Sequence, residues 1–139
     1  MRLRVIAAFL GAGVASVAPA WAHHAFAAEF DSNHPIKLEG TVTRLELINP
    51  HSWIHMDVTG QDGKVSSWMI ECGSPNTLYR HGFTKDSIKA GTKIIVDGYV
   101  AKDGDNRANG RDVTLPNGQK LFLGSSGTGA PGEKNEPEK

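Results

Sequence analysis

The chain has 139 residues, which is enough for one domain and too short for two of ordinary size. It carries fifteen basic and fifteen acidic residues and a single cysteine, Cys72. This balance argues against a nucleic-acid-binding protein, which needs a basic surface. One cysteine cannot form a disulfide within the chain, so the apolar core must hold the domain together.

Residues 1–22 have the pattern of a secretory signal peptide. Two arginines precede an apolar run over residues 5–17, and Ala20-Trp21-Ala22 supplies the small residues of a cleavage site. We predict cleavage after Ala22 and a periplasmic or secreted product; cleavage after Ala20 is the alternative. The apolar run is shorter than the roughly 18 residues of a membrane-spanning helix, so no span is expected after cleavage. The mature chain then keeps thirteen basic and fifteen acidic residues, a net charge of −2.

Residues 23–35 form a separate N-terminal segment in this interpretation. Phe26 and Phe30 are four residues apart, which places them on one side of a short helical turn. Because such a turn is too short to be stable alone, we expect the segment to dock on the body of the domain.

The body, residues 36–124, reads mainly as strands. Apolar residues alternate from Ile36, and a one-residue slip near Thr43-Arg44 predicts a β-bulge in a long first strand. Ser74 and Pro75 predict a helix start, and Gly82 predicts its end. The further strands are expected at 48–58, 65–72, 93–102, 112–115 and 119–123, with a polar loop over residues 103–110.

This order predicts an all-β fold with one short helix, a small five-stranded barrel like the OB-fold, in which the helix lies between strands three and four. Another small barrel or an α+β sandwich is the alternative. From residue 125 to the end, Gly, Ser, Pro, Glu and Lys dominate and no apolar period survives. Residues 125–139 are therefore predicted to be a disordered tail.

Several motifs together resemble a family of short exported bacterial proteins classed only as a domain of unknown function. They are His-His-Ala-Phe-Ala-Ala-Glu-Phe-Asp (23–31), Gly-Thr-Val-Thr (40–43), Ile-Asn-Pro-His-Ser-Trp (48–53), Gly-Ser-Pro-Asn-Thr-Leu (73–78), Gly-Phe-Thr (82–84) and Gly-Tyr-Val-Ala-Lys-Asp-Gly (98–104). The resemblance implies an exported bacterial protein with one small β-rich domain. It implies no activity, so it assigns no residue a role.

The mature N-terminus is the first candidate site. After cleavage at Ala22, the free α-amine and the imidazole of His23 can chelate a metal, and a further histidine can complete the set. This arrangement resembles the histidine brace of copper proteins. His24, His51 and His55 are the candidates for the third ligand. The alternative is that the paired histidines are only solvated residues of a mobile terminus.

The stretch from Ile48 to Val58 is the second candidate. Its alternation places His51, Trp53, His55 and Asp57 on one face and apolar residues on the other. Along a strand His51 and His55 stand about 13 Å apart, too far to share one metal with bonds near 2 Å. The alternative is a packing role, in which Phe26 or Phe30 covers Trp53 and the histidines line the contact.

Two weaker candidates are better explained without a ligand. Met69 and Cys72 are soft donors for Cu(I), but a lone cysteine at a strand end is typical of a small buried hydrophobe. The loop from Asp103 to Asp112 resembles a calcium loop, but Thr114 stands where an EF-hand needs glutamate. A solvated, turn-rich loop accounts for it.

No catalytic motif appears in the chain, so we expect a non-enzymatic periplasmic binding protein. Copper or another transition metal at His23, His24 and His51 is the leading ligand. The alternative is an interaction module without metal, in which Trp53, His55 and Asp57 bind a small organic ligand or a periplasmic protein partner. An oxidative copper enzyme is the third option, and a mature chain of this length leaves little room for its substrate cleft.

Overall fold

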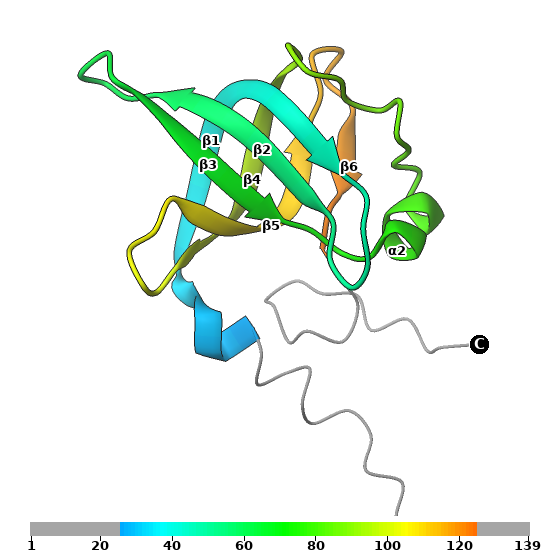
Figure 1. Cartoon of the computed structure of the whole chain (residues 1–139), viewed down its shortest axis with the longest axis horizontal. Coiled ribbons are helices and arrows are strands. Elements are labelled where there is room, and N and C mark those ends of the chain that lie inside the picture. Colours follow the sequence, from blue (N-terminus) through cyan, green and yellow to red (C-terminus); the bar gives the residue numbers. More distant parts are fainter. Residues whose placement is uncertain (1–25, 125–139) are drawn as a thin grey trace, which may run out of the picture.

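The computed structural model describes residues 26–124 of the chain (Figure 1). The predicted signal peptide (1–22), His23, His24 and the predicted tail (125–139) therefore lie outside the described residues. A helical turn at residues 26–29 comes first. The other elements are β1 (Phe30–Glu46), β2 (Trp53–Thr59), β3 (Val65–Glu71), α2 (Pro75–Arg80), β4 (Lys93–Ala101), β5 (Arg107–Thr114) and β6 (Lys120–Phe122).

The strands form one six-stranded sheet in the order β3-β2-β1-β4-β5-β6, with antiparallel neighbours. One further pairing, parallel, joins β3 to β5. It connects the two ends of the series β3-β2-β1-β4-β5, so these five strands form a closed ring of hydrogen-bonded neighbours. The prediction of a mostly β protein is confirmed. The prediction of one helix was incomplete, because the turn at residues 26–29 is a second short helix.

Bends in the strands allow the ring to close. The register of β1 against β2 shifts between Val42 and Arg44, which confirms the predicted bulge. A second register shift lies between β4 and β5: Asp97 pairs with Asp112 and Gly98 with Gly110, so Arg111 is the extra residue of β5. A Cβ atom at Gly98 would lie 2.0 Å from the carbonyl oxygen of Asn109, so the close approach of the two strands requires glycine there.

Helix α2 begins and ends where the sequence predicts. The backbone N–H of Thr77 donates to Oγ of Ser74, the N-cap residue, and Pro75 occupies the first turn. Gly82 follows the C-terminal cap with a φ of 82°, a conformation in which glycine is unstrained. The helix connects β3 to β4 and buries Leu78 in the core.

Three predicted strand boundaries were wrong. β1 begins at Phe30 rather than Ile36, because Phe30 already pairs with Ala101 of β4. β2 begins only at Trp53, so residues 47–52 form a loop. β5 begins at Arg107, inside the segment predicted as a polar loop, because pairing with both β3 and β4 outweighs its turn-rich composition.

The core lies inside the ring of strands. Its buried members come from every strand and from the β3–β4 connection; the most enclosed are Val42, Ile54, Met56, Ile70, Leu78, Phe83, Ile94, Val96, Val113 and Leu123. Cys72 belongs to this cluster. A smaller cluster of Phe26, Phe30, Tyr99 and Ala101 lies apart from it and fastens the N-terminal segment. Within residues 26–124, no helix is long and apolar enough to cross a membrane.

Two isoleucines close to each other in sequence test this core. Ile54 is fully buried on the inner face of β2, whereas Ile48 in the preceding loop is 51% exposed. We expect Ile54→Ala to lower the free energy of unfolding by about 2–5 kcal/mol, because it leaves a cavity. Ile48→Ala should change it by less than about 0.5 kcal/mol. Denaturant unfolding monitored by fluorescence measures both, and equal losses would contradict the assigned core.

Candidate functional site

Strand β2 presents the predicted polar face on the outside of the ring. Ile54 and Met56 are fully buried, whereas Trp53, His55 and Asp57 between them are half-buried. The alternation predicted from the sequence is therefore confirmed. The outward residues of β3 continue this face, since paired residues of antiparallel strands point to the same side: Glu71 lies opposite Trp53, Met69 opposite His55 and Ser67 opposite Asp57.

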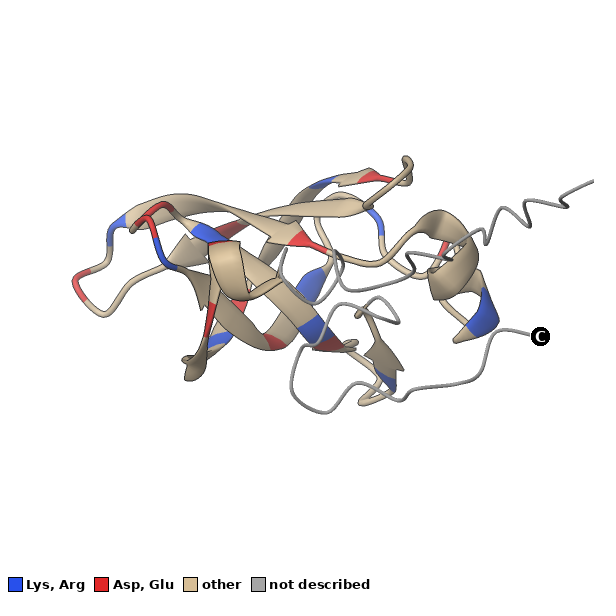
Figure 2. Ribbon diagram, turned by 90° about the horizontal axis from the view of Figure 1, so that it is seen from below, with Lys and Arg blue, Asp and Glu red and all other residues tan. Residues whose placement is uncertain are grey.

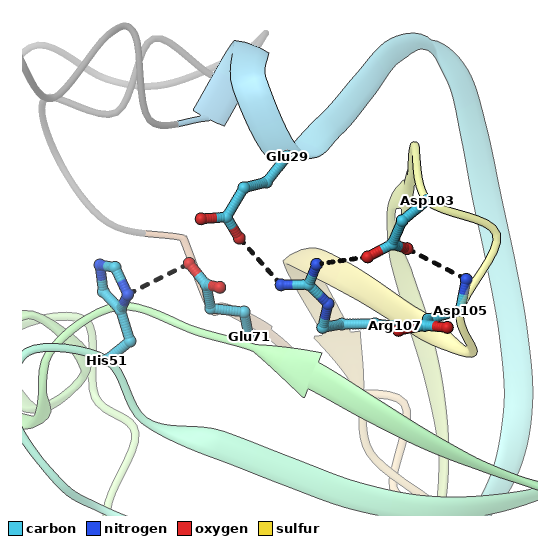
Figure 3. A network of polar contacts seen from close by, with 6 residues as sticks. All are labelled: Glu29, His51, Glu71, Asp103, Asp105 and Arg107. Atoms are coloured by element: carbon cyan, nitrogen blue, oxygen red, sulfur yellow. Dashed lines mark hydrogen bonds and ion pairs between the residues drawn. The ribbon is translucent and has the colours of Figure 1, made fainter.

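His51 pairs with a carboxylate that the sequence analysis did not single out. The loop of residues 47–52 places its Nδ1 3.2 Å from Oε1 of Glu71, at the end of β3 (Figure 3). The Glu71 side chain is only 12% exposed, although it lies on the outward side of its strand. Burial raises the pKa of Glu71, and the nearby His51 partly opposes this rise.

A second carboxylate reaches the same place from the N-terminal segment. Glu29 accepts a hydrogen bond from Nη1 of Arg107 at 2.8 Å, and Asp103 accepts one from Nη2 at 3.0 Å (Figure 3). The charge of Glu29 contributes to the raised pKa of Glu71, while Arg107 acts in the opposite sense. His51, Glu71, Glu29 and Arg107 thus form one charged cluster, at the junction where β3 pairs with β5.

The N-terminal segment is fastened beside this junction. Phe26 packs edge-on against Tyr99, with ring centroids 5.6 Å apart, and the guanidinium of Arg107 lies 5.3 Å from the ring centre of Phe30. The backbone N–H of Lys102 donates to the carbonyl of Glu29 at 2.9 Å. Figure 1 shows the resulting position of the helical turn, next to the loop between β4 and β5.

Phe26 and Phe30 belong to the buried cluster with Tyr99 and Ala101. Pairing of Phe30 with Ala101 places the start of β1 beside β4. The alternative, in which one of these rings covers Trp53, stays a prediction.

His55 and Asp57 have partners of their own on this face. Nε2 of His55 lies 3.0 Å from Oε2 of Glu46, and Ser67 donates to Asp57 at 2.8 Å. The hydrogen bond from His55, with the charge of Arg44 close by, lowers the pKa of Glu46. His51 and His55 therefore face different carboxylates. Among residues 26–124, no group of three His, Cys, Asp or Glu side chains is close enough to hold a metal.

The fold separates the two sulfurs of the first weaker candidate. Cys72, which directly follows β3, lies in the core, where burial raises its pKa, whereas Met69 points outward from β3. The two sulfurs therefore lie on opposite sides of the sheet and cannot bind one metal together. Asp103 accepts from the backbone N–H of Asp105 and from Arg107, as the side chain of an exposed loop does.

A shallow hollow of about 480 Å³ lies where β1, β2 and β3 meet the loop before β5. Its lining comes from β1, β2, β3 and the loop before β5: Thr43, Arg44, His55, Met56, Ser67, Trp68, Met69 and Asn106. Trp53 is not part of this lining. Basic and acidic residues are interspersed over the described elements (Figure 2), so the charged cluster at the β3–β5 junction is a local feature.

Sequence reasoning missed Glu71, Glu29 and Arg107 as members of the site. For Glu71 a signal existed, because its outward position on β3 follows from the alternation that also buries Ile70. For Glu29 and Arg107 no signal existed, since they are far apart in the chain and meet only through the tertiary fold.

Comparison with protein families gives one match. The model of the "Family of unknown function (DUF6152)" matches residues 12–110, more than half of the chain. The chain belongs to this family. The match confirms the resemblance inferred from the motifs, and it covers the helical turn, β1 to β4 and the first half of β5. Neither a curated protein nor a solved structure matches the chain.

The burial of Glu71 has a consequence for stability that can be measured without any metal. A carboxyl whose pKa is raised by folding favours the folded state most when protonated, below its ordinary pKa of 4.5. This contribution is lost as the pH rises through the folded pKa. We therefore expect Glu71→Gln to match the wild type near pH 4 and to melt at a progressively higher temperature than the wild type toward pH 8.

The measurement is thermal unfolding at several pH values in buffer containing a chelator. Glu39→Gln, an exposed carboxylate on β1, is the control and should show no such trend. A Glu71→Gln variant less stable than the wild type at pH 8 would show that the pairing with His51 outweighs the burial of the carboxylate.

Proposed function

We propose that this protein is an exported, non-enzymatic metal-binding module. Its metal, copper or another late transition metal, would be held by the α-amine and imidazole of His23, by His24 and by His51. The observation that supports the proposal is the charged cluster at the β3–β5 junction, where His51 pairs with Glu71 and Glu29 of the fastened N-terminal segment acts electrostatically on Glu71.

The short sequence distance between the two histidines and Phe26 limits how far they can lie from the cluster. Phe26 is buried against Tyr99, and His24 and His23 precede it by two and three residues. At about 3.5 Å per extended residue, both histidines are tethered within about 11 Å of Phe26. Glu29, three residues after Phe26, already interacts electrostatically with Glu71, the partner of His51. The amine is free only if cleavage follows Ala22, so export and processing are part of the proposal.

The chemistry of the cluster suits a cation. Glu71 and Glu29 repel each other in a partly desolvated place, and a bound cation would relieve this repulsion. A carboxylate beside a ligating imidazole also fixes the orientation of the ring, as Glu71 can do for His51. Amine and imidazole nitrogens are donors that Cu, Ni and Zn prefer over Ca or Mg. When bound, such a metal supplies a Lewis-acidic and, for copper, a redox-active centre.

We also propose that the ring of five strands is a small barrel of the OB-fold type. The order around the ring, β1-β2-β3-β5-β4, and the position of α2 between β3 and β4 support it. Proteins of that fold bind ligands on the face of strands two and three, between the loop joining strands one and two and the loop joining strands four and five. His51 lies in the first of these loops and Asp103 in the second.

The hollow beside His55 favours a second candidate function. In this alternative the face of Trp53, His55 and Asp57 binds a small organic ligand or a periplasmic protein without metal, and of these three residues His55 lines the hollow. The hollow of about 480 Å³ has the size of a small-molecule site, although it is open. Trp53→Ala would then abolish binding, and changes to His23 and His24 would not.

Copper titration of the processed protein tests the leading proposal. Mass spectrometry first verifies that His23 is the N-terminal residue, and a competing chelator then reports the Cu(II) affinity. We expect the double variant His23→Ala, His24→Ala and the single variant His51→Ala each to bind at least about tenfold more weakly, a difference of about 1.4 kcal/mol.

His34→Ala is the matched control, because His34 is exposed and pairs only locally with Asp31. It should bind Cu(II) like the wild type. If all variants bind as the wild type does, or if the wild type itself does not bind, the proposed site is wrong.

A further inference from the structure

His55 and Met69 lie directly opposite each other on the outer face. They are Cα partners in the register of β2 and β3. The backbone N–H of Met69 points away from β2, since it donates to the carbonyl of Asn106. The pair is therefore of the type without mutual hydrogen bonds, in which the Cα atoms are about 4.5 Å apart and the side chains are closest. Both residues also line the hollow of about 480 Å³.

The His55 ring is oriented by a carboxylate on the neighbouring strand. Nε2 lies 3.0 Å from Oε2 of Glu46 and 3.2 Å from Nη2 of Arg44. Nε2 cannot both donate to Glu46 and accept from Arg44. Nη2 of Arg44 already has a partner, because it lies 3.0 Å from Oε1 of Glu46. The consistent arrangement is an Nε2–H that donates to Glu46.

This tautomer leaves Nδ1 of His55 with a lone pair. No group within the described part of the chain forms a hydrogen bond with that nitrogen. A histidine whose other N–H donates to a carboxylate is the usual arrangement of a metal-ligating imidazole. Glu46 thus prepares Nδ1 to bind a ligand that accepts an electron pair.

The residue facing it is a thioether. Met69 is 41% exposed, whereas Met56 on the adjacent strand is fully buried in the core. Packing therefore does not explain the sulfur at position 69. Thioether and imidazole together select Cu(I) and disfavour Ca²⁺, Mg²⁺ and Mn²⁺, which prefer oxygen ligands.

We propose that Nδ1 of His55 and Sδ of Met69 form a binding site for a soft monovalent cation, Cu(I), on the outer face of β2 and β3. The ion is bound as Cu(I) and no electron transfer is involved. The site goes beyond the function proposed above, because it uses none of the N-terminal histidines and does not depend on processing.

Silver is a suitable probe, because Ag(I) has the same preference for soft ligands and is not oxidised in air. The methionines of the predicted mature chain are Met56 and Met69. When their methyl groups are labelled, the Met56 resonance is the internal control for the Met69 resonance. The background is the double variant His23→Ala, His24→Ala. On adding one equivalent of Ag(I), we expect the Met69 methyl resonance to shift and the Met56 resonance to stay.

Affinity for Cu(I), measured without oxygen against a Cu(I) chelator, completes the test. Met69→Leu keeps the shape of the side chain and removes the sulfur, and His55→Gln removes the imidazole. Each should weaken Cu(I) binding by at least about tenfold. Val65→Leu, at an exposed position on β3, and His34→Gln are controls that should bind as the background does.

The two proposals can fail separately. If the His23→Ala, His24→Ala variant, without further changes, does not bind Cu(I), then Cu(I) and Cu(II) both bind at the N-terminus. This result would overturn the His55–Met69 site. Unchanged Cu(I) affinity in Met69→Leu, or equal shifts of both methionine methyls, would overturn it as well. Cu(I) binding lost in Met69→Leu, with Cu(II) binding indifferent to His51, would support this site and reject the other.

Discussion

The parallel pairing of β3 with β5 is the constraint on which the rest of the structure depends. Only three residue pairs form it: Met69 with Arg107, Ile70 with Ala108 and Glu71 with Asn109. The middle pair is fully buried and completes the core, while the flanking residues Met69, Glu71 and Arg107 remain at the surface. A short contact between segments almost forty residues apart thus closes the ring and determines which polar side chains meet on its outside.

The charged cluster follows from this closure. Arg107 is held at the start of β5, within reach of Glu29, so the N-terminal segment is fastened where β3 ends. Glu71 becomes partly desolvated there, and its carboxylate pairs with His51 of the loop of residues 47–52, while Glu29 and Arg107 act on it electrostatically. A carboxylate that burial disfavours, next to an imidazole and a second carboxylate, is an arrangement that a cation stabilises. The geometry therefore concentrates the N-terminal segment, the loop of residues 47–52 and the end of β3 at one place.

Local features of this fold could be predicted because their causes are local. The bulge in β1, the alternation of β2 and the caps of α2 each follow from a few neighbouring residues, and each is confirmed. The start of β5 could not be predicted, since Asp103–Gly110 has the composition of a loop and becomes a strand only through its two partners. For the same reason the sequence left the partners of Phe26 and Phe30 open, because nothing near them in the chain reveals that β1 already pairs with β4 at Phe30. His51 could be singled out from the sequence as a candidate, but its partner Glu71 required the fold.

The proposed metal site lies beside His51 at the β3–β5 junction. Anomalous diffraction from crystals of the processed protein, grown with copper and recorded on both sides of the copper absorption edge, tests it most directly. A peak at about 2 Å from a His51 ring nitrogen, with the N-terminal amine among its neighbours, is the predicted result. A copper peak distant from His51, with the His51–Glu71 pair unchanged, would contradict the account.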